Sequence, residues 1–258
     1  MHTSEHTLHT SVPENRTALD ILYQDKFLVA VHKPAGLLVH KSPIDKHETR
    51  YAMKILRDQI GQWVYPVHRL DKPTSGLLLF ALHPDIGSQV SQSFEDRTIE
   101  KSYCAIVRGF TETAGTIDHA LKEIAVFKQL QKQAELKAPK EAVTRYTRLA
   151  QFELPYSDGR FATSRYSMIE VHPETGRKHQ IRRHLKHISH PIIGDVKYGK
   201  GSHNRFFQEH FGASRLMLAA TELRFTHPFS GDRVHLNCPF ETSFANTLAQ
   251  LSEFKVSA

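Results

Sequence analysis

The segment 67–80, with the sequence VHRLDKPTSGLLLF, constrains the fold of this chain more than any other stretch. The apolar run from Leu77 to Ala81 has the composition of a strand that is buried on both faces. Just before it, Pro73 fixes the backbone angle φ and Gly76 permits a positive φ, which is typical of a tight turn. The segment therefore predicts a strand, a sharp turn and a second, buried strand.

The residues before this turn place charge at the end of the buried strand. If residues 67–71 are extended, Val67, Arg69 and Asp71 alternate and share one face. A rigid sheet that presents an arginine and an aspartate at a loop is a common way to build a functional site. An Arg–Asp pair is also often a structural ion pair, and aspartate before proline is an ordinary turn former. Spacing alone leaves both interpretations open.

The composition indicates a globular protein with a preference for polyanions. The 258 residues are 40% hydrophobic and carry a net charge of +7, which favours nucleic acid or an anionic membrane as a partner. No apolar run reaches the length of a membrane span, and the N-terminus lacks the apolar core of a secretory signal. The two cysteines, Cys104 and Cys238, suit a reducing compartment, so we expect a cytoplasmic protein.

Hydrophobic periodicity predicts a mixture of strands and helices. The expected strands are 21–23, 27–31, 37–40, 99–109, 144–146, 166–171, 223–226 and 234–236. The expected helices are 47–61, 85–97, a segment that follows Gly176, and a last one near 241–251. Residues 1–17 are polar and aperiodic, which predicts a disordered tail before one domain over 18–258. The predicted fold class is α+β, with a mixed, mostly antiparallel sheet flanked by helices and loops.

Five motifs in this chain resemble those of the RluA-type family of RNA pseudouridine synthases. They are ILYQDKFLVAVHKPAGLLVH (21–40), HRLDKPTSGLLLFA (68–81), KSYCAIVRG (101–109), TGRKHQIRRH (175–184) and RLMLAA (215–220). The resemblance extends over roughly residues 19–250 and implies a pseudouridine synthase catalytic domain with its active-site cleft across the sheet. Many family members carry an additional N-terminal RNA-binding domain of the S4 type, for which the tail 1–17 is too short.

The resemblance implies three catalytic residues. Asp71 matches the catalytic aspartate, Tyr103 the tyrosine that stacks on the target base and can act as a base, and Arg182 the arginine that pairs with Asp71. A carboxylate suits a reaction that breaks a glycosidic bond, because it can attack as a nucleophile or stabilise positive charge at C1′. An arginine within reach favours the charged form of such a carboxylate.

The resemblance also assigns residues to the RNA substrate. Arg69 is implied to fill the base stack after the target uridine has flipped out. The other implied substrate-binding residues are His68, Arg177, His179 and Leu218, and Leu218 is the one expected to line the base pocket. Together with the catalytic residues they predict one site built from distant parts of the sequence.

The implied reaction is an isomerisation without redox change, so we expect no cofactor, and the chain has no dinucleotide-binding or P-loop signature. We expect no metal either, because His184, His187 and His190 spread around a helix instead of converging. The segment 175–195 and the short N-terminus most resemble the branch that modifies uridine 65 of tRNA. The expected partner is therefore tRNA, with no membrane, and the chain is expected to act as a monomer.

Three alternatives stay open from the sequence. The first is a pseudouridine synthase that acts on ribosomal RNA. The second is a glycoside or nucleoside hydrolase that uses Asp71 with a second carboxylate, Glu170 or Glu174. The third is a non-catalytic RNA-binding protein, which gives no reason for the HRLD sequence at a tight turn. The basic segment 118–145 fits either an RNA-contacting loop or a solvated face.

Overall fold

The computed structural model describes residues 18–41, 48–125, 137–157 and 161–256. The expected tail, 1–17, and the middle of the basic segment 118–145 lie outside these ranges. The strands are β1 (Asp20–Gln24), β2 (Leu28–Lys33), β3 (Tyr65–Pro66), β4 (Ser75–Ala81), β5 (Glu100–Arg108), β6 (Ala114–Asp118), β7 (Val143–Leu154), β8 (Ser164–Pro173), β9 (Leu218–Thr226) and β10 (Arg233–Asn237). The helices are α1 (Ala52–Ile60), α2 (Pro84–Glu95), α4 (Gln180–His187), α5 (Gly201–Phe211) and α6 (Thr242–Ser252).

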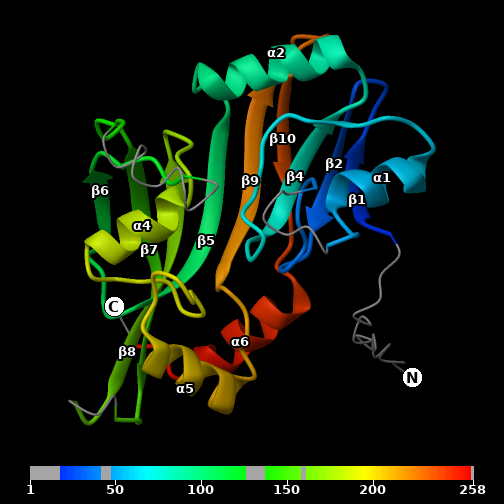
Figure 1. Ribbon diagram of the computed structural model, residues 1–258. Helices are drawn as coiled ribbons and strands as arrows, with labels where there is room; N and C mark the ends of the chain where they lie inside the picture. The colour runs from blue at the N-terminus through cyan, green and yellow to red at the C-terminus, as the bar shows by residue number, and fades with distance from the viewer. Residues whose placement is uncertain (1–17, 42–47, 126–136, 158–160, 257–258) are drawn as a thin grey trace, which may run out of the picture.

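Over the described ranges the strands form one sheet of ten, in the order β1-β2-β4-β9-β5-β8-β7-β6, with β3 beside β4 and β10 beside β9. β4 and β9 run parallel, whereas the other neighbouring strands in those ranges are antiparallel. Figure 1 shows α2 across one end of this sheet and α5 and α6 at the other. This is the mixed, mostly antiparallel α+β fold that the sequence predicts. No helix in the described part of the chain is long and apolar enough to cross a membrane.

The strand β4 lies at the centre of the core, as its apolar sequence predicts. All seven of its residues are buried, because each face packs against a different apolar cluster. Leu77 and Leu79 face a cluster that includes Ile86 of α2, and Leu78 faces one that includes Leu56 of α1. A strand buried on both faces gives the turn before it a rigid base.

The predicted strand at 37–40 is wrong. Leu38 makes a single bridge to Tyr51, and the backbone amides of Ala52 and Met53 donate to the carbonyls of Leu38 and Val39. These carbonyls take the first amides of α1, which have no partner inside their own helix. The segment therefore seats the N-terminus of a helix, a role that local apolar composition does not distinguish from a strand.

The predicted strand before the central turn is short. β3 covers two residues, and the buried Val67 and Leu70 lie three apart, so residues 67–71 do not alternate as an extended strand would. The ring nitrogen Nε2 of His68 instead accepts a hydrogen bond of 3.0 Å from the backbone amide of Leu79. The His68 side chain thus binds an amide of β4 that a neighbouring strand would otherwise bind. The backbone of residues 67–71 does not have to pair with β4 and can bend toward Asp71.

Two elements were not predicted from the sequence, α5 and β6. In α5 the buried side chains are His203 and Phe207, and the ring of His203 lies 2.8 Å from the hydroxyl of Tyr166. α5 is packed through polar and aromatic contacts. Its sequence therefore lacks the regular apolar spacing from which a helix is predicted. β6 is a short edge strand that pairs with β7, with Ile117 as its buried residue.

Gly76 lies where β4 meets the parallel strand β9. Its φ is 112°, and a Cβ atom at this position would lie 2.1 Å from the carbonyl oxygen of Ala220. Both the backbone angle and the close approach exclude any residue with a side chain. The residue that the sequence identifies as a turn former is therefore also a contact point between strands.

We expect Gly76→Ala to lower the free energy of unfolding by about 2–4 kcal/mol, because it combines backbone strain with a backbone clash. Urea denaturation measures the loss. Gly61→Ala is the matched control, since Gly61 has a φ of 71° but open space around it, and we expect a loss of about 1 kcal/mol there. Equal losses in the two variants would show that the approach to Ala220 does not require glycine.

Candidate active site

A cleft of about 660 Å³ crosses the sheet beside the turn that follows Leu70. Its walls come from the β3–β4 loop, the end of α2, the start of β5, the β8–α4 loop, α4 and the start of β9. All eight residues that the sequence nominates line it: His68, Arg69, Asp71, Tyr103, Arg177, His179, Arg182 and Leu218. The structure therefore brings them together, while their individual roles stay predictions.

Asp71 presents its carboxylate to this cleft from a hydrogen-bonded turn. The amide of Thr74 donates to the Asp71 carbonyl at 3.0 Å, and the Asp71 side chain is 18% exposed. Its oxygen Oδ2 accepts from Nη1 of Arg182 at 3.1 Å, and Oδ1 lies 3.8 Å from Nε2 of His179. One oxygen is thus held, and the other is beyond hydrogen-bond distance of that histidine.

Arg182 is fixed from its other side by a second aspartate. Its Nε and Nη2 donate to Oδ2 and Oδ1 of Asp195 at 2.7 and 2.9 Å, a bidentate pair in which the Asp195 side chain is fully buried. Burial opposes ionisation, but the two carboxylates still raise the pKa of Arg182. The guanidinium therefore stays charged and points at Asp71.

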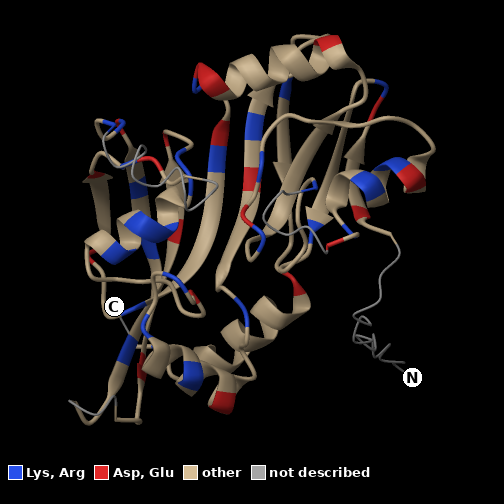
Figure 2. Ribbon diagram, viewed as in Figure 1, with Lys and Arg blue, Asp and Glu red and all other residues tan. Residues whose placement is uncertain are grey.

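Arg182 is buried, and its second partner was not recognised in the sequence. Its side chain is only 8% exposed, although it lies on a helix rich in basic residues. Asp195 was not recognised as part of the site, because it lies 13 residues downstream in a stretch that reads as a plain turn. Figure 2 shows the basic positions of α4 in blue, on the helix that packs against β7 and β8.

The loop before α4 is held by Gln180. Its oxygen Oε1 accepts from the hydroxyl of Thr175 at 2.6 Å and from the amide of Arg177 at 3.0 Å, and its Nε2 donates to the carbonyl of Val143 at 2.9 Å. A single buried amide therefore sets the course of the TGR segment over the cleft. Arg177 itself is half-buried and directs Nε to the carbonyl of Glu141 at 3.0 Å.

His179 is an uncharged neighbour of Asp71 near neutral pH. It sits at the start of α4 with a φ of 57°, and its Nδ1 lies 2.9 Å from the hydroxyl of Tyr198. Burial lowers the pKa of His179 to about 4, although the Asp71 carboxylate opposes the shift. Its positive φ is unusual for histidine and turns the ring toward the cleft.

Tyr103 and Leu218 form the apolar wall of the cleft, on the neighbouring strands β5 and β9. Burial raises the pKa of Tyr103 well above its usual value, and the nearby Asp71 carboxylate adds to the shift. Tyr103 therefore presents a neutral phenol ring, which is a suitable surface for stacking a base. Arg69, in contrast, is exposed, two residues before Asp71.

His68 supports the loop rather than pointing freely into the cleft. Besides its bond to Leu79, its ring stacks on Phe94 of α2, with centroids 4.7 Å apart. Burial lowers the pKa of His68 to about 3, with a contribution from Lys101. The neutral ring is required, because Nε2 must carry a lone pair to accept the Leu79 amide.

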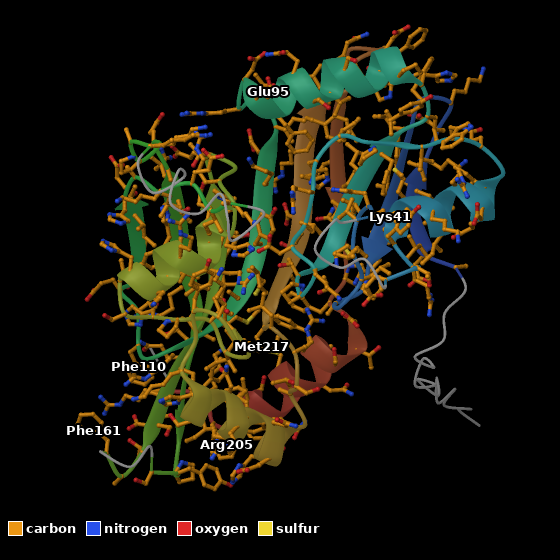
Figure 3. The ribbon with its side chains drawn as sticks, viewed as in Figure 1. Lys41, Glu95, Phe110, Phe161, Arg205 and Met217 are labelled. Atoms are coloured by element: carbon orange, nitrogen blue, oxygen red, sulfur yellow. The ribbon has the colours of Figure 1, made fainter. Side chains whose placement is uncertain are left out.

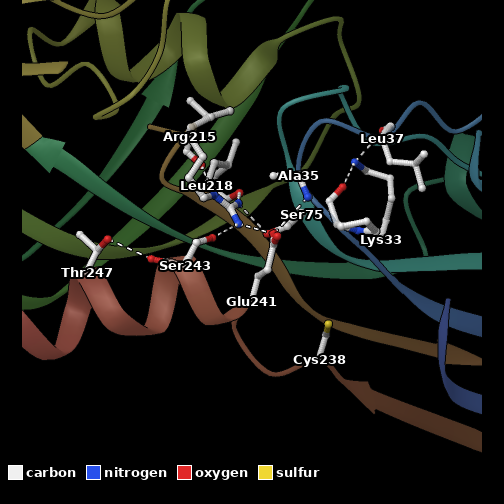
Figure 4. A network of polar contacts seen from close by, with 12 residues as sticks. Lys33, Ala35, Leu37, Ser75, Arg215, Leu218, Cys238, Glu241, Ser243 and Thr247 are labelled. Carbon is white, nitrogen blue, oxygen red and sulfur yellow. Dashed lines mark hydrogen bonds and ion pairs between the residues drawn. The ribbon is translucent and has the colours of Figure 1, made fainter. Parts of the chain in front are cut away.

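A polar network lies beneath the turn (Figure 4). The buried ammonium of Lys33 donates to the carbonyls of Pro34, Leu37 and Lys72 at 2.8, 2.9 and 3.2 Å, so it binds the residue next to Asp71. Burial lowers the pKa of Lys33 to about 7, and the nearby Glu241 carboxylate opposes that shift. These contacts give Lys33 a structural role beneath the turn.

The same network ties the C-terminal helix to the cleft. Arg215 donates to the carboxylate of Glu241, to Oγ of Ser75 at 2.7 Å and to the carbonyl of Leu218 at 3.3 Å. Glu241 also accepts from the amide of Ala35 at 3.0 Å. Four segments that are distant in sequence thus meet behind Asp71, and none of these contacts was predicted from the sequence.

The sequence matches the family described as RNA pseudouridylate synthase over residues 27–187. The chain belongs to this family. It is 55% identical over 217 residues to the tRNA pseudouridine synthase C of Vibrio cholerae, covering 82% of this chain and 87% of that protein. It is 48% identical over 237 residues to the tRNA pseudouridine synthase C of Yersinia pestis, covering 90% of each.

A solved structure has the same fold. The structure of Human RNA Pseudouridylate Synthase Domain Containing 1 aligns with a TM-score of 0.69 at 25% identity, covering 94% of this chain and 96% of that one. Family membership confirms the resemblance that the five motifs indicate. The chain is thus an RNA pseudouridine synthase, which is an isomerase.

The histidines of α4 have partners of their own. The two ring nitrogens of His184 lie 2.9 Å from Oγ1 of Thr144 and 3.0 Å from the carbonyl of His119, and His187 stacks on His119 with centroids 3.8 Å apart. Within the described ranges, no group of His, Cys, Asp or Glu is arranged to hold a metal ion.

The low pKa of His68 predicts acid sensitivity. The unfolded chain takes up a proton near pH 6.5 and the folded His68 does not until about pH 3, so stability falls as the pH drops below 6.5. His68→Gln keeps an acceptor for Leu79 but cannot titrate. We expect it to reduce the loss of unfolding free energy between pH 7 and 5 by about 2 kcal/mol.

Urea denaturation at the two pH values measures this loss. The control is His210→Gln, a change at an exposed histidine of α5, which should leave the pH dependence as in the wild type. If the His68 variant keeps the pH dependence of the wild type, His68 is not the source of the acid sensitivity.

Proposed function

We propose that this protein isomerises uridine to pseudouridine in tRNA, with uridine 65 as its target, and that Asp71 is its catalytic residue. The observation that carries the proposal is the Asp71 carboxylate, held by the buried Arg182 in the same cleft as Tyr103. The tRNA substrate is supported by the 48–55% identity to proteins named tRNA pseudouridine synthase C. Uridine 65 is supported by the resemblance of the segment 175–195 to the tRNA branch.

The proposed reaction breaks the bond between N1 of the uracil and C1′ of the ribose, turns the base, and joins C1′ to C5. Asp71 acts as nucleophile or stabilises positive charge at the ribose, and the C5 proton leaves after the new bond has formed. The base must first leave the RNA stack, at a cost of a few kcal/mol. Arg69, exposed on the rim, is placed to fill the gap, and Tyr103 to stack on the flipped uracil.

The hydrolase alternative requires Glu170 or Glu174 as a second carboxylate beside Asp71, and the positions of these two residues do not favour it. Glu170 lies 3.2 Å from the ring of His172, and Glu174 lies 2.6 Å from Nε of Arg145. Neither is among the described residues that line the cleft. A binding role without catalysis gives no reason for an aspartate held by a buried arginine. Ribosomal RNA as the substrate is tested by mapping the product.

We further propose that residues 18–258 form a single catalytic domain that acts as a cytoplasmic monomer. The walls of the cleft come from segments between residues 67 and 218, and one sheet joins β1 at one edge to β6 at the other. Cys104 and Cys238 are both buried free thiols, which suits a reducing compartment.

Asp71→Asn should lower turnover by at least about a thousandfold, because the amide cannot supply the negative charge at C1′. tRNA affinity should stay within about twofold. The measurement is tritium release from tRNA labelled at C5 of uracil, with the product position mapped by sequencing. Asp58→Asn, an exposed change on α1, should behave as wild type. Wild-type rates in the Asp71 variant would exclude it as the catalytic residue.

Tyr103→Phe should keep tRNA affinity within about threefold, because the stacking face is preserved, and lower turnover about a hundredfold through loss of the hydroxyl. Tyr103→Leu removes the ring as well, so it should weaken binding in addition. Single-turnover rates and filter binding on the same preparations separate the two effects. Unchanged turnover in the Phe variant would exclude proton transfer by Tyr103 and leave stacking as its role.

A further inference from the structure

A cluster of three charged residues lies at the edge of the cleft. Nη1 and Nη2 of Arg97 donate to Oε1 and Oε2 of Glu141 at 3.1 and 2.8 Å, and Nε of Arg177 donates to the Glu141 carbonyl at 3.0 Å. Arg97 follows α2, Glu141 precedes β7, and Arg177 belongs to the loop before α4. Both arginines line the cleft that contains Asp71.

The contact joins two parts of the molecule that meet at the cleft. Figure 3 labels Glu95 where α2 ends above β5, two residues before Arg97. Glu141 lies two residues before the start of β7. The pair is exposed, with side chains that retain 42% and 57% of their surface in water. Exposed ion pairs add little to stability, so folding alone does not explain this one.

The backbone at Arg97 points to a function for its side chain. Thr98 donates its amide to Ser93 at 3.0 Å and Arg97 to Phe94 at 3.3 Å, which is the Schellman pattern at the end of a helix. The residue at this position is usually glycine, because φ is positive, and Arg97 has a φ of 62°. An arginine is therefore held in an unfavourable conformation at the cleft, as is common for functional residues.

The chemistry of the cluster fits a phosphate group. A guanidinium that binds both oxygens of a carboxylate presents the same fork to two oxygens of a phosphodiester. Further cations, Lys101 and Lys178, line the same cleft. An RNA whose uridine enters this cleft must place a neighbouring backbone phosphate along its edge.

We propose that Arg97 and Arg177 form a phosphate-binding subsite for the RNA backbone, and that the Glu141 carboxylate occupies it until RNA displaces that carboxylate. The inference rests on the proposed function for the identity of the RNA, but not on the role of Asp71. Glu141 is then a specificity residue. A phosphate of correctly bound RNA displaces its carboxylate from the subsite, whereas weakly bound anions or misplaced RNA do not.

The first test is the charge of Glu141. Glu141→Gln should bind a tRNA transcript about three- to tenfold more tightly than wild type at low salt, because no carboxylate has to leave the subsite. The matched control is Glu153→Gln, which removes the same charge from an exposed pair with Arg165 away from the cleft. We expect less than a twofold change there. Equal gains in the two variants would overturn the proposal, because they would reflect net charge alone.

The second test is Arg97→Gly. Glycine suits the backbone at this position, so the variant should be at least as stable as wild type in thermal unfolding. It should bind tRNA about tenfold more weakly, and the slope of log K against log[salt] should fall in magnitude by about one. In the double variant with Glu141→Gln, the gain from removing the carboxylate should vanish. An unchanged affinity and slope would overturn the proposal.

These measurements separate the subsite from the reaction. Tritium release by the wild type reports on the proposed function, whereas binding of the same transcript reports on the subsite. If the wild type turns over and the Arg97 variant binds the transcript as tightly as the wild type, the subsite is refuted and the proposed reaction stands. Binding that responds to Arg97 and Glu141 without any turnover would refute the proposed reaction and support the subsite.

Discussion

The chain of charges Asp71–Arg182–Asp195 is the interaction on which the site depends. Removing one member of such a buried arrangement leaves an uncompensated charge, which is costly in a poorly hydrated interior. Asp195 is satisfied by Arg182 and by the amides of Lys197 and Tyr198, both at 2.9 Å. The arginine thus has one partner that is fixed and one that faces the cleft. The contact with Asp195 therefore holds the arginine in place independently of Asp71.

Support for Asp71 comes from the backbone as much as from side chains. The Lys72 carbonyl accepts from the Lys33 ammonium at 3.2 Å and from the amide of Gly36 at 2.8 Å. Behind it, Arg215 connects Ser75 to Glu241 and so to the start of α6. The turn is therefore surrounded by hydrogen bonds from segments that lie far apart in the sequence. If Asp71 is the catalytic group, as proposed, such preorganisation reduces what the substrate must contribute to order it.

The sequence predicts much of this architecture because its strongest signals are local. Buried strands such as β4 and the amphipathic helix α2 carry period and composition in a few consecutive residues. The motifs identify eight residues that line the cleft, because these residues belong to the motifs themselves. Local patterns do not reveal contacts such as Asp195 with Arg182, because a single aspartate in a turn has no distinguishing neighbours. They also misassign residues 37–40, where carbonyls cap a helix.

The strand order has a consequence for the newly made chain. β9 lies between β4 and β5 in the sheet but is synthesised long after both, from residues 218–226. Until the ribosome has released that segment, β4 and β5 each have an unsatisfied edge facing the gap, and such edges favour association with other chains. Leu218, the first residue of this strand, also lines the cleft. The segment that closes the sheet therefore also supplies the last part of the cleft wall to be synthesised.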